Sequence, residues 1–225
     1  MTLTTLPELE QRTPEWDDQR RGIVTASVVG QLVTPSTLKV ANNDQSRALV
    51  WQLAAERITG WTEPTYVSDD MWRGVEDEPR AVEHYAETRA SVKRVGFMVR
   101  TEEWGTLGYS PDGLVGETGL IECKSRKPKK HLQTILSDTV PPENMAQLQA
   151  GLLVSEREWI DYVSWCGGMP MWVIRVAPDL KWFEAIRAAV DAYEQAADRM
   201  TREYRQAVNG LPATERPTND LGLVF

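Results

Sequence analysis

The stretch that decides the fold is Gly108-Tyr-Ser-Pro-Asp-Gly-Leu-Val115, which is followed after a short turn by Gly119-Leu-Ile-Glu-Cys-Lys124. Both pieces are short, rich in apolar residues and bounded by Gly or Pro, which predicts two β-strands. Pro111 has no N–H to donate to a neighbouring strand, so we expect Asp112 at or near the beginning of its strand. An acidic residue therefore precedes a Glu-x-Lys triplet by ten residues.

The alternation of side chains along a strand gives this spacing a meaning. Glu122 and Lys124 project to one side of their strand, while Ile121 and Cys123 project to the other side, which we expect to be buried. If the turn between the strands has an odd number of residues, or contains a bulge, Asp112 falls opposite Glu122. A two-residue turn would instead place Asp112 on the wrong face.

Two adjacent carboxylates repel each other unless a cation joins them. Hard oxygen ligands suit Mg²⁺ or Mn²⁺ better than Zn²⁺. Such an ion polarises a phosphodiester and lowers the pKa of bound water, and Lys124 is placed to orient or deprotonate that water, so the set Asp112, Glu122 and Lys124 predicts phosphodiester hydrolysis. The alternative is structural: Asp112 begins a turn, and Glu122 with Lys124 is an exposed ion pair.

Length and composition bound the remaining possibilities. A chain of 225 residues with 41% hydrophobic and 26% charged residues is typical of one globular domain, here residues 1–225 with tails at about 1–13 and 210–225. The sequence has neither an apolar run of roughly 20 residues nor the start of a signal peptide, so we expect no membrane association and a cytoplasmic location. The two cysteines, Cys123 and Cys166, are expected to be buried thiols.

The charge pattern favours a nucleic-acid partner only locally. The formal net charge is −8, which argues against phosphate binding by the surface as a whole. The segment Lys124-Ser-Arg-Lys-Pro-Lys-Lys130 nevertheless places five cations within seven residues, directly after the acidic motif. Standing alone, this segment would be read as a solvated basic loop, but it begins inside the acidic motif and is therefore a candidate for contact with nucleic acid.

The remaining periodicities predict an α/β fold in which helices flank one mixed central β-sheet. We expect helices at 15–20, 25–32, 45–59, 73–90, 142–154 and 180–205, and strands at 91–99, 113–115, 120–124, 159–165 and 171–176.

Pro111-Asp112 with Glu122-Cys-Lys124 resembles the PD-(D/E)XK nuclease signature. From Trp16 to about Met200 the chain resembles the lambda exonuclease branch of that superfamily, the YqaJ-like viral recombinases. Several further motifs occur in the same order, namely Trp16 with Arg20-Arg-Gly-Ile-Val-Thr-Ala-Ser27, Arg73-Gly-Val-Glu-Asp-Glu78 with Ala81, Ser110-Pro-Asp-Gly-Leu114, and Met145-Ala-Gln-Leu-Gln149.

The resemblance implies further residues at the active site. It adds Glu78 as a catalytic residue and metal ligand, with Glu76 as a rival because two residues at this spacing diverge on a helix. It also adds the backbone carbonyl of Cys123 as a metal ligand, beside Asp112 and Glu122. Gln147 matches a catalytic glutamine, whose amide would hold water or a phosphate oxygen.

The resemblance also implies a pocket for a terminal 5′-phosphate, formed by Arg20, Ser27 and Ser110. Arg20 offers a fork of donors to phosphate, and Ser27 lies near the start of an expected helix. The alternative is a helix capped by Thr25 with Arg20 on the surface.

Taken together, the resemblance implies an Mg²⁺-dependent exonuclease, with Mn²⁺ as a possible substitute, that degrades double-stranded DNA from 5′ ends and leaves a 3′ single strand. It further implies a ring of three subunits, a single-strand annealing protein as partner, and a phage or prophage source. Two alternatives stay open: a restriction-like endonuclease with the same active site, and a catalytically inactive protein that binds DNA ends.

Overall fold

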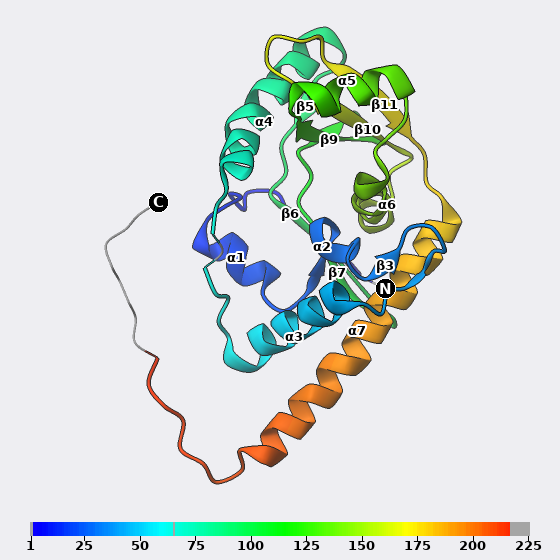
Figure 1. Ribbon diagram of the computed structural model, residues 1–225. Helices are drawn as coiled ribbons and strands as arrows, with labels where there is room; N and C mark the ends of the chain where they lie inside the picture. Colours follow the sequence, from blue (N-terminus) through cyan, green and yellow to red (C-terminus); the bar gives the residue numbers. More distant parts are fainter. Residues whose placement is uncertain (1, 65, 217–225) are drawn as a thin grey trace.

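A mixed five-stranded sheet carries the motif from which the sequence analysis began. The computed structural model describes residues 2–64 and 66–216 of the chain (Figure 1). The strand order is β11-β10-β9-β8-β5, in which β9 and β10 run parallel and the other neighbours antiparallel. The strands span Val92–Lys93 (β5), Gly113–Val115 (β8), Gly119–Ser125 (β9), Trp159–Trp165 (β10) and Trp172–Val176 (β11). The α/β class and the mixed sheet are confirmed.

The hairpin of β8 and β9 has the register on which the predicted site depends. Val115 pairs with Gly119 and Gly113 pairs with Ile121, which leaves an odd turn of three residues, 116–118. Gly116 begins this turn with a φ of +53°, a conformation that favours glycine. Continued by one residue, the register places Asp112 opposite Glu122, as the odd turn requires.

A second sheet of four strands lies beside the first, so the expectation of one sheet is wrong. Its order is β1-β6-β7-β2, with strands at Thr2–Leu6 (β1), Val24–Thr25 (β2), Phe97–Glu102 (β6) and Gly105–Tyr109 (β7). The strand expected at 91–99 is divided between the two sheets at Gly96. A Cβ there would lie 1.8 Å from the carbonyl oxygen of Leu9, because the N-terminal segment crosses at this point.

The N-terminal segment expected as a tail is ordered structure. Strand β1 pairs antiparallel with β6 along its whole length, and its residues are mostly exposed. An exposed edge strand has no buried face and therefore no alternation of polar and apolar residues for the sequence to show. The apolar C-terminal residues 221–225 lie outside the described part of the chain.

Seven helices in the described part of the chain pack around the two sheets (Figure 1). They span Pro14–Arg20 (α1), Ala26–Val29 (α2), Asp44–Thr59 (α3), Asp69–Thr88 (α4), Pro128–Ser137 (α5), Pro142–Ser155 (α6) and Leu180–Ala207 (α7), and a two-stranded hairpin joins Val33–Thr34 (β3) to Lys39–Val40 (β4). The helix expected at 25–32 is a single turn, and α5, which the sequence did not predict, begins at Pro128 within the basic segment. None of these helices is long and apolar enough to cross a bilayer.

Helix α6 forms the centre of the core and brings a polar residue to the site. Its residues from Leu148 to Ser155 are buried, and it packs against α2, α7 and strand β7. Gly151 allows the close approach to β7, because a Cβ there would lie 2.8 Å from Cζ of the buried Tyr109. Gln147 therefore lies close to the end of β7, where the chain continues toward Asp112.

Candidate active site

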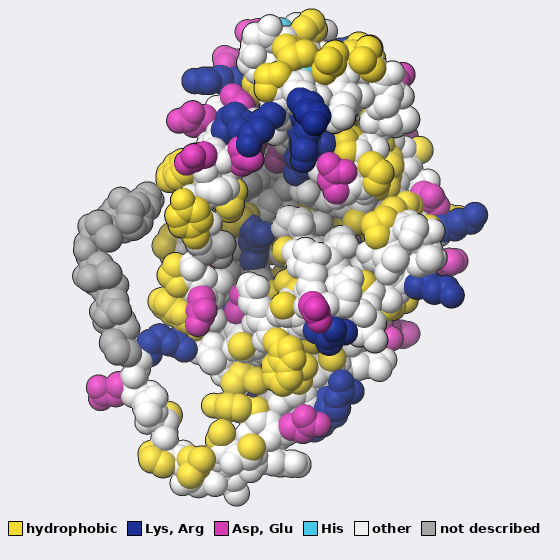
Figure 2. Space-filling model, viewed as in Figure 1, with side chains coloured by type: hydrophobic (Ala, Val, Ile, Leu, Met, Phe, Trp, Pro, Cys, Tyr) yellow, Lys and Arg dark blue, Asp and Glu magenta, His cyan; other side chains and the backbone are white. Residues whose placement is uncertain are grey.

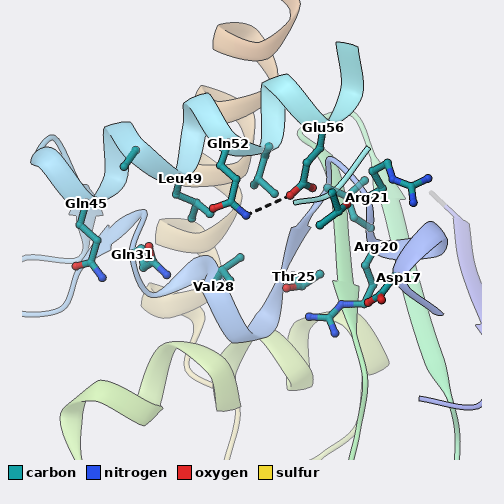
Figure 3. Close-up of a pocket in the computed structure, with 14 residues that line it drawn as sticks. Asp17, Arg20, Arg21, Thr25, Val28, Gln31, Gln45, Leu49, Gln52 and Glu56 are labelled. Carbon is teal, nitrogen blue, oxygen red and sulfur yellow. Dashed lines mark hydrogen bonds between the residues drawn. The ribbon is translucent and has the colours of Figure 1, made fainter. Parts of the chain in front are cut away.

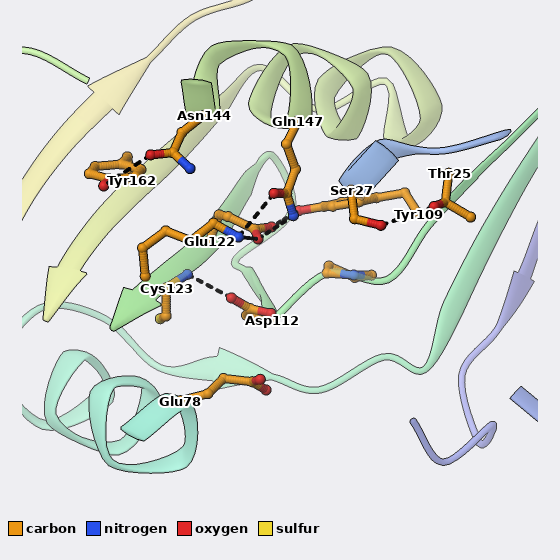
Figure 4. Close-up of polar contacts among 12 residues, drawn as sticks. Thr25, Ser27, Glu78, Tyr109, Asp112, Glu122, Cys123, Asn144, Gln147 and Tyr162 are labelled. Carbon is orange, nitrogen blue, oxygen red and sulfur yellow. Dashed lines mark hydrogen bonds and ion pairs between the residues drawn. The ribbon is translucent and has the colours of Figure 1, made fainter. Parts of the chain in front are cut away.

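Asp112 and Glu122 form a buried pair of carboxylates. Only 9% of Asp112 and 3% of Glu122 are exposed. The backbone N–H of Cys123 donates to Oδ2 of Asp112 at 2.6 Å, and the hydroxyl of Tyr109 donates to Oε2 of Glu122 at 3.3 Å (Figure 4). Burial, together with the charges of Glu122 and Glu78, raises the pKa of Asp112 well above its ordinary value. A cation beside the pair would relieve this repulsion.

Lys124 and Gln147 complete a compact cluster around Glu122. Nζ of Lys124 lies 2.8 Å from Oε1 of Glu122 and donates to Oε1 of Gln147 at 2.9 Å, while Nε2 of Gln147 donates to Oε1 of Glu122 at 2.5 Å. Burial lowers the pKa of Lys124, but the charges of Glu122 and Asp112 outweigh it and leave the pKa above its ordinary value. Because Glu122 is buried, the exposed ion pair weighed as an alternative does not occur.

Of the two candidate acids on α4, Glu78 faces the carboxylate pair. Figure 4 shows its side chain pointing toward Asp112 from the opposite side of the site. Oε2 of Glu78 lies 2.6 Å from the Arg12 guanidinium, and its Oε1 lies 3.5 Å from that of Arg94. Glu76 is exposed and lies outside the lining of the cavity.

A cavity of about 550 Å³ brings the predicted side chains together. Among its lining residues are Arg20, Ser27, Glu78, Ser110, Asp112, Glu122, Cys123, Lys124 and Gln147, which is every residue predicted for catalysis, metal binding and phosphate binding. Figure 2 shows the surface hollowed between α4 and α6, with Lys and Arg side chains gathered on its upper rim. Residues from six parts of the sequence thus share one space.

The residues predicted for phosphate binding lie at one end of this cavity. Arg20 stacks on Trp16 at 3.6 Å from the ring centre, and Trp16 Nε1 donates to Oγ of Ser110 at 2.9 Å. Oγ of Ser27 lies 3.4 Å from Arg20 and 3.0 Å from Oγ1 of Thr25. Burial lowers the pKa of Arg20 to about 10, which leaves it charged at neutral pH.

The alternative for this region holds only in part. Thr25 does occupy the N-cap position of α2, but its side chain makes no capping hydrogen bond to the helix, and Arg20 is partly buried rather than on the open surface. The helix that begins here has only four residues, so its dipole would contribute little to the binding of an anion at Ser27. Direct donors therefore dominate this end of the cavity.

The donor set fits a hard divalent cation. In the described residues, no group of three His, Cys, Asp or Glu side chains is arranged around a common point as it stands, and Glu78 is paired with Arg12. Mg²⁺ commonly takes only one or two carboxylates and fills its other positions with water and substrate phosphate. The buried pair Asp112 and Glu122 supplies those two carboxylates.

Several residues that the sequence did not single out support the site. Tyr109 donates to Glu122, and Arg12 pairs with Glu78 from the N-terminal segment. Oγ of Ser125 donates to Oδ2 of Asp77 at 2.6 Å and ties α4 to the end of β9. Oδ1 of Asn144, on α6, accepts from the hydroxyl of Tyr162 at 3.4 Å. In the sequence, only their closeness to the motifs pointed to these residues.

A model of the YqaJ-like viral recombinase domain matches residues 15–158. The chain belongs to this family. The chain is also similar to LHK-Exo, an alkaline exonuclease from Laribacter hongkongensis, with 30% identity over 89% of this chain and 100% of that one and a TM-score of 0.78. A second structure of LHK-Exo, in complex with dAMP, gives a TM-score of 0.77, with the same 30% identity and the same coverage.

A phage-related exonuclease from Haemophilus somnus 129PT shares the fold of this YqaJ-like recombinase. It is 14% identical over 81% of this chain and 96% of that one, with a TM-score of 0.64. No curated protein sequence is similar enough to count as a match. The PD-(D/E)XK nuclease core and the family expected from the sequence are confirmed, and they are those of phage-type exonucleases.

Proposed function

We propose that this protein is a metal-dependent exonuclease that hydrolyses double-stranded DNA from 5′-phosphorylated ends. One observation carries the proposal: the carboxylate–lysine cluster of Asp112, Glu122 and Lys124 shares a single cavity with Arg20 and Ser27. The first group suits a scissile phosphodiester, and the second offers a guanidinium and a hydroxyl to a terminal phosphate. The similarity to an alkaline exonuclease supports the same class of reaction.

The carboxylates and the lysine have different roles at the scissile bond. Asp112 and Glu122, with the backbone carbonyl of Cys123 and with Glu78 nearby, would hold Mg²⁺, or Mn²⁺ in its place. When bound, the ion supplies Lewis-acid polarisation of the phosphate and a lowered pKa for water. The Lys124 ammonium donates hydrogen bonds to the attacking water or to a phosphate oxygen.

The terminal phosphate site sets the polarity that we propose. A strand whose 5′-phosphate lies on Arg20, Ser27 and Ser110 would present the phosphodiester that follows to Lys124. Each cleavage would then release a mononucleotide and leave a growing 3′ single strand. That product suits homologous recombination of the phage type, in which a single-strand annealing protein binds the exposed strand. We therefore propose that a phage or prophage gene encodes the protein and that it acts in the host cytoplasm.

The decisive test is release of acid-soluble nucleotides from 5′-phosphorylated linear duplex DNA in Mg²⁺. We expect Lys124→Ala to lower the rate by about a hundredfold or more, since it removes a donor to developing charge. Lys181→Ala, an exposed lysine on α7, is the matched control and should match wild type. EDTA should abolish release.

Closed circular duplex DNA separates the rival functions. An enzyme that needs a 5′ end leaves the circle intact, whereas a restriction-like endonuclease with the same active site opens it. Binding to DNA ends in EDTA without cleavage in Mg²⁺ or Mn²⁺ would indicate the inactive end-binding protein. Equal activity of Lys124→Ala and wild type would overturn the active site itself.

A further inference from the structure

A second cavity, of about 330 Å³, adjoins the active-site cavity (Figure 3). Arg20 and Thr25 line both cavities and form the wall between them. The second cavity lies between α3 and the segment from Ile23 to Gln31, and none of the residues predicted for catalysis or metal binding lines it. We call it the α3 groove.

The walls of the α3 groove are apolar, whereas its edges are polar. Figure 3 shows Leu49 from α3 and Val28 from α2 projecting toward one another, so that two apolar faces oppose each other. Around them lie the amides of Gln31, Gln45 and Gln52. A slot with apolar faces and amide edges suits a flat ring that carries both hydrogen-bond donors and acceptors.

The charges of the α3 groove are balanced. Arg20 and Arg21 contribute two cations, and Asp17 and Glu56 contribute two carboxylates. Glu56 is already engaged, because its Oε2 accepts from the backbone N–H of Gly22 at 2.9 Å and its Oε1 accepts from Gln52 at 3.1 Å. The groove therefore favours a neutral polar group rather than a second phosphate.

Two residues that line the α3 groove each carry a buried polar atom. Nε of Arg21 and Oγ1 of Thr62 are buried, and in residues 2–64 and 66–216 they have no hydrogen-bond partner. A ligand that reached either atom on binding would give it a hydrogen-bond partner. They belong to Arg21 and Thr62, two of the residues that line the α3 groove.

We propose that the α3 groove is a subsite for the nucleobase of a 5′-phosphorylated nucleotide whose phosphate lies on Arg20. The placement of the phosphate rests on the proposed function. Because Arg20 is the common wall, a nucleoside attached to that phosphate can extend into the α3 groove as well as toward Lys124. The nucleotide is either the terminal nucleotide of the strand or a released mononucleotide, and the two share the same chemistry.

Filling the groove tests the proposal without touching Arg20. Ala48 is exposed on α3 and lines the groove, so Ala48→Trp would occupy the space of a base. Ala55→Trp is the matched control, since Ala55 is exposed on the same helix outside the lining. The probes are deoxyadenosine 5′-monophosphate and 2-deoxyribose 5-phosphate, measured by calorimetry in EDTA.

We expect wild type to bind the nucleotide at least about tenfold more tightly than the sugar phosphate. Ala48→Trp should remove this preference, Ala55→Trp should keep it, and Arg20→Ala should weaken both ligands. Equal binding of the two probes by wild type, or an unchanged preference in Ala48→Trp, would overturn the subsite. Because no cleavage is needed, these results are independent of whether wild type degrades DNA.

Kinetics then identify the source of the base. If the groove takes the terminal nucleotide of the strand, Ala48→Trp raises KM for 5′-phosphorylated linear duplex. If it takes the released nucleotide, KM stays constant and inhibition by added mononucleotide weakens. Digestion by wild type with no effect of Ala48→Trp on either quantity would overturn the subsite and leave the nuclease standing.

Discussion

Gln147 holds both partners of the central ion pair at once. Its amide oxygen accepts from Lys124 and its amide nitrogen donates to Glu122, so the side chain has a defined orientation. An amide can make both contacts, whereas a carboxylate at this position would repel Glu122 and an apolar group would leave Lys124 with fewer acceptors. We therefore expect Gln147 to position Lys124 rather than to bind the metal.

Replacement of Gln147 by leucine should test this positioning role. We expect Gln147→Leu to lower kcat by about tenfold to a hundredfold, as the loss of a supporting contact does at other sites, with KM nearly unchanged. The measurement is steady-state digestion of linear duplex DNA in Mg²⁺. Gln195→Leu, on the exposed side of α7, is the control, and equal kcat values for the two variants would contradict the role.

At the scale of single residues the sequence predicted which side chains of the β8–β9 hairpin lie together, because β-strand geometry is strict. Once the turn of residues 116–118 is odd, the period of two places Asp112 opposite Glu122 and Lys124 beside it. The contacts of Tyr109 and Arg12 could not be predicted in this way. They depend on how β7 and the N-terminal segment fold back across the site, which no local period encodes.

Helix α4 presents Glu78 to the site and keeps Glu76 in solvent, and this difference allows a matched experiment. We expect Glu78→Gln to raise the Mg²⁺ concentration for half-maximal activity by about tenfold, because it removes a negative charge near the metal site. Glu76→Gln should have no effect. Titration of activity against Mg²⁺ measures both, and an equal response would mean that α4 contributes no charge to the metal.

Helix α7 stabilises the fold through one apolar stripe, whose buried members include Ile186, Val190 and Tyr193. Ile186 is fully buried in the core, so Ile186→Ala should lower the free energy of unfolding by about 2–5 kcal/mol. Leu180 lies on the same helix but is 72% exposed, and Leu180→Ala should change it by less than about 0.5 kcal/mol. Urea denaturation measures both, and similar losses would contradict the assigned core.

Elements with strong periodicity were predictable, and those defined by distant partners were not. The stripe of α7 and the apolar run of β9 carry their own signals. Strand β1 forms by pairing with the edge of β6, and α5 begins at Pro128 inside a basic run for which the sequence predicted no helix. The division at Gly96 reflects the crossing of Leu9, a contact between segments far apart in the sequence.

At the scale of the whole molecule, the proposed function requires an acidic protein to bind DNA, which is a polyanion. The net charge is −8, so long-range electrostatics oppose DNA binding, and the cations of the cavity act only at short range. A ring of three subunits around the DNA, which we propose by resemblance, would retain the substrate by topology instead. Sedimentation should then give three chains of 25.4 kDa per particle.

If a closed ring retains the DNA, salt should affect the binding of new DNA ends but not the degradation of DNA that is already threaded. Raising NaCl from about 50 to about 200 mM weakens a contact with several phosphates by orders of magnitude, so new DNA ends should no longer be bound. Duplexes already threaded should continue to be degraded. Two differently labelled linear DNAs, one added before and one after the salt, separate these cases in a single reaction. If degradation of both stops together, and the particle has the mass of one chain, ordinary charge contacts hold the DNA and the ring is wrong.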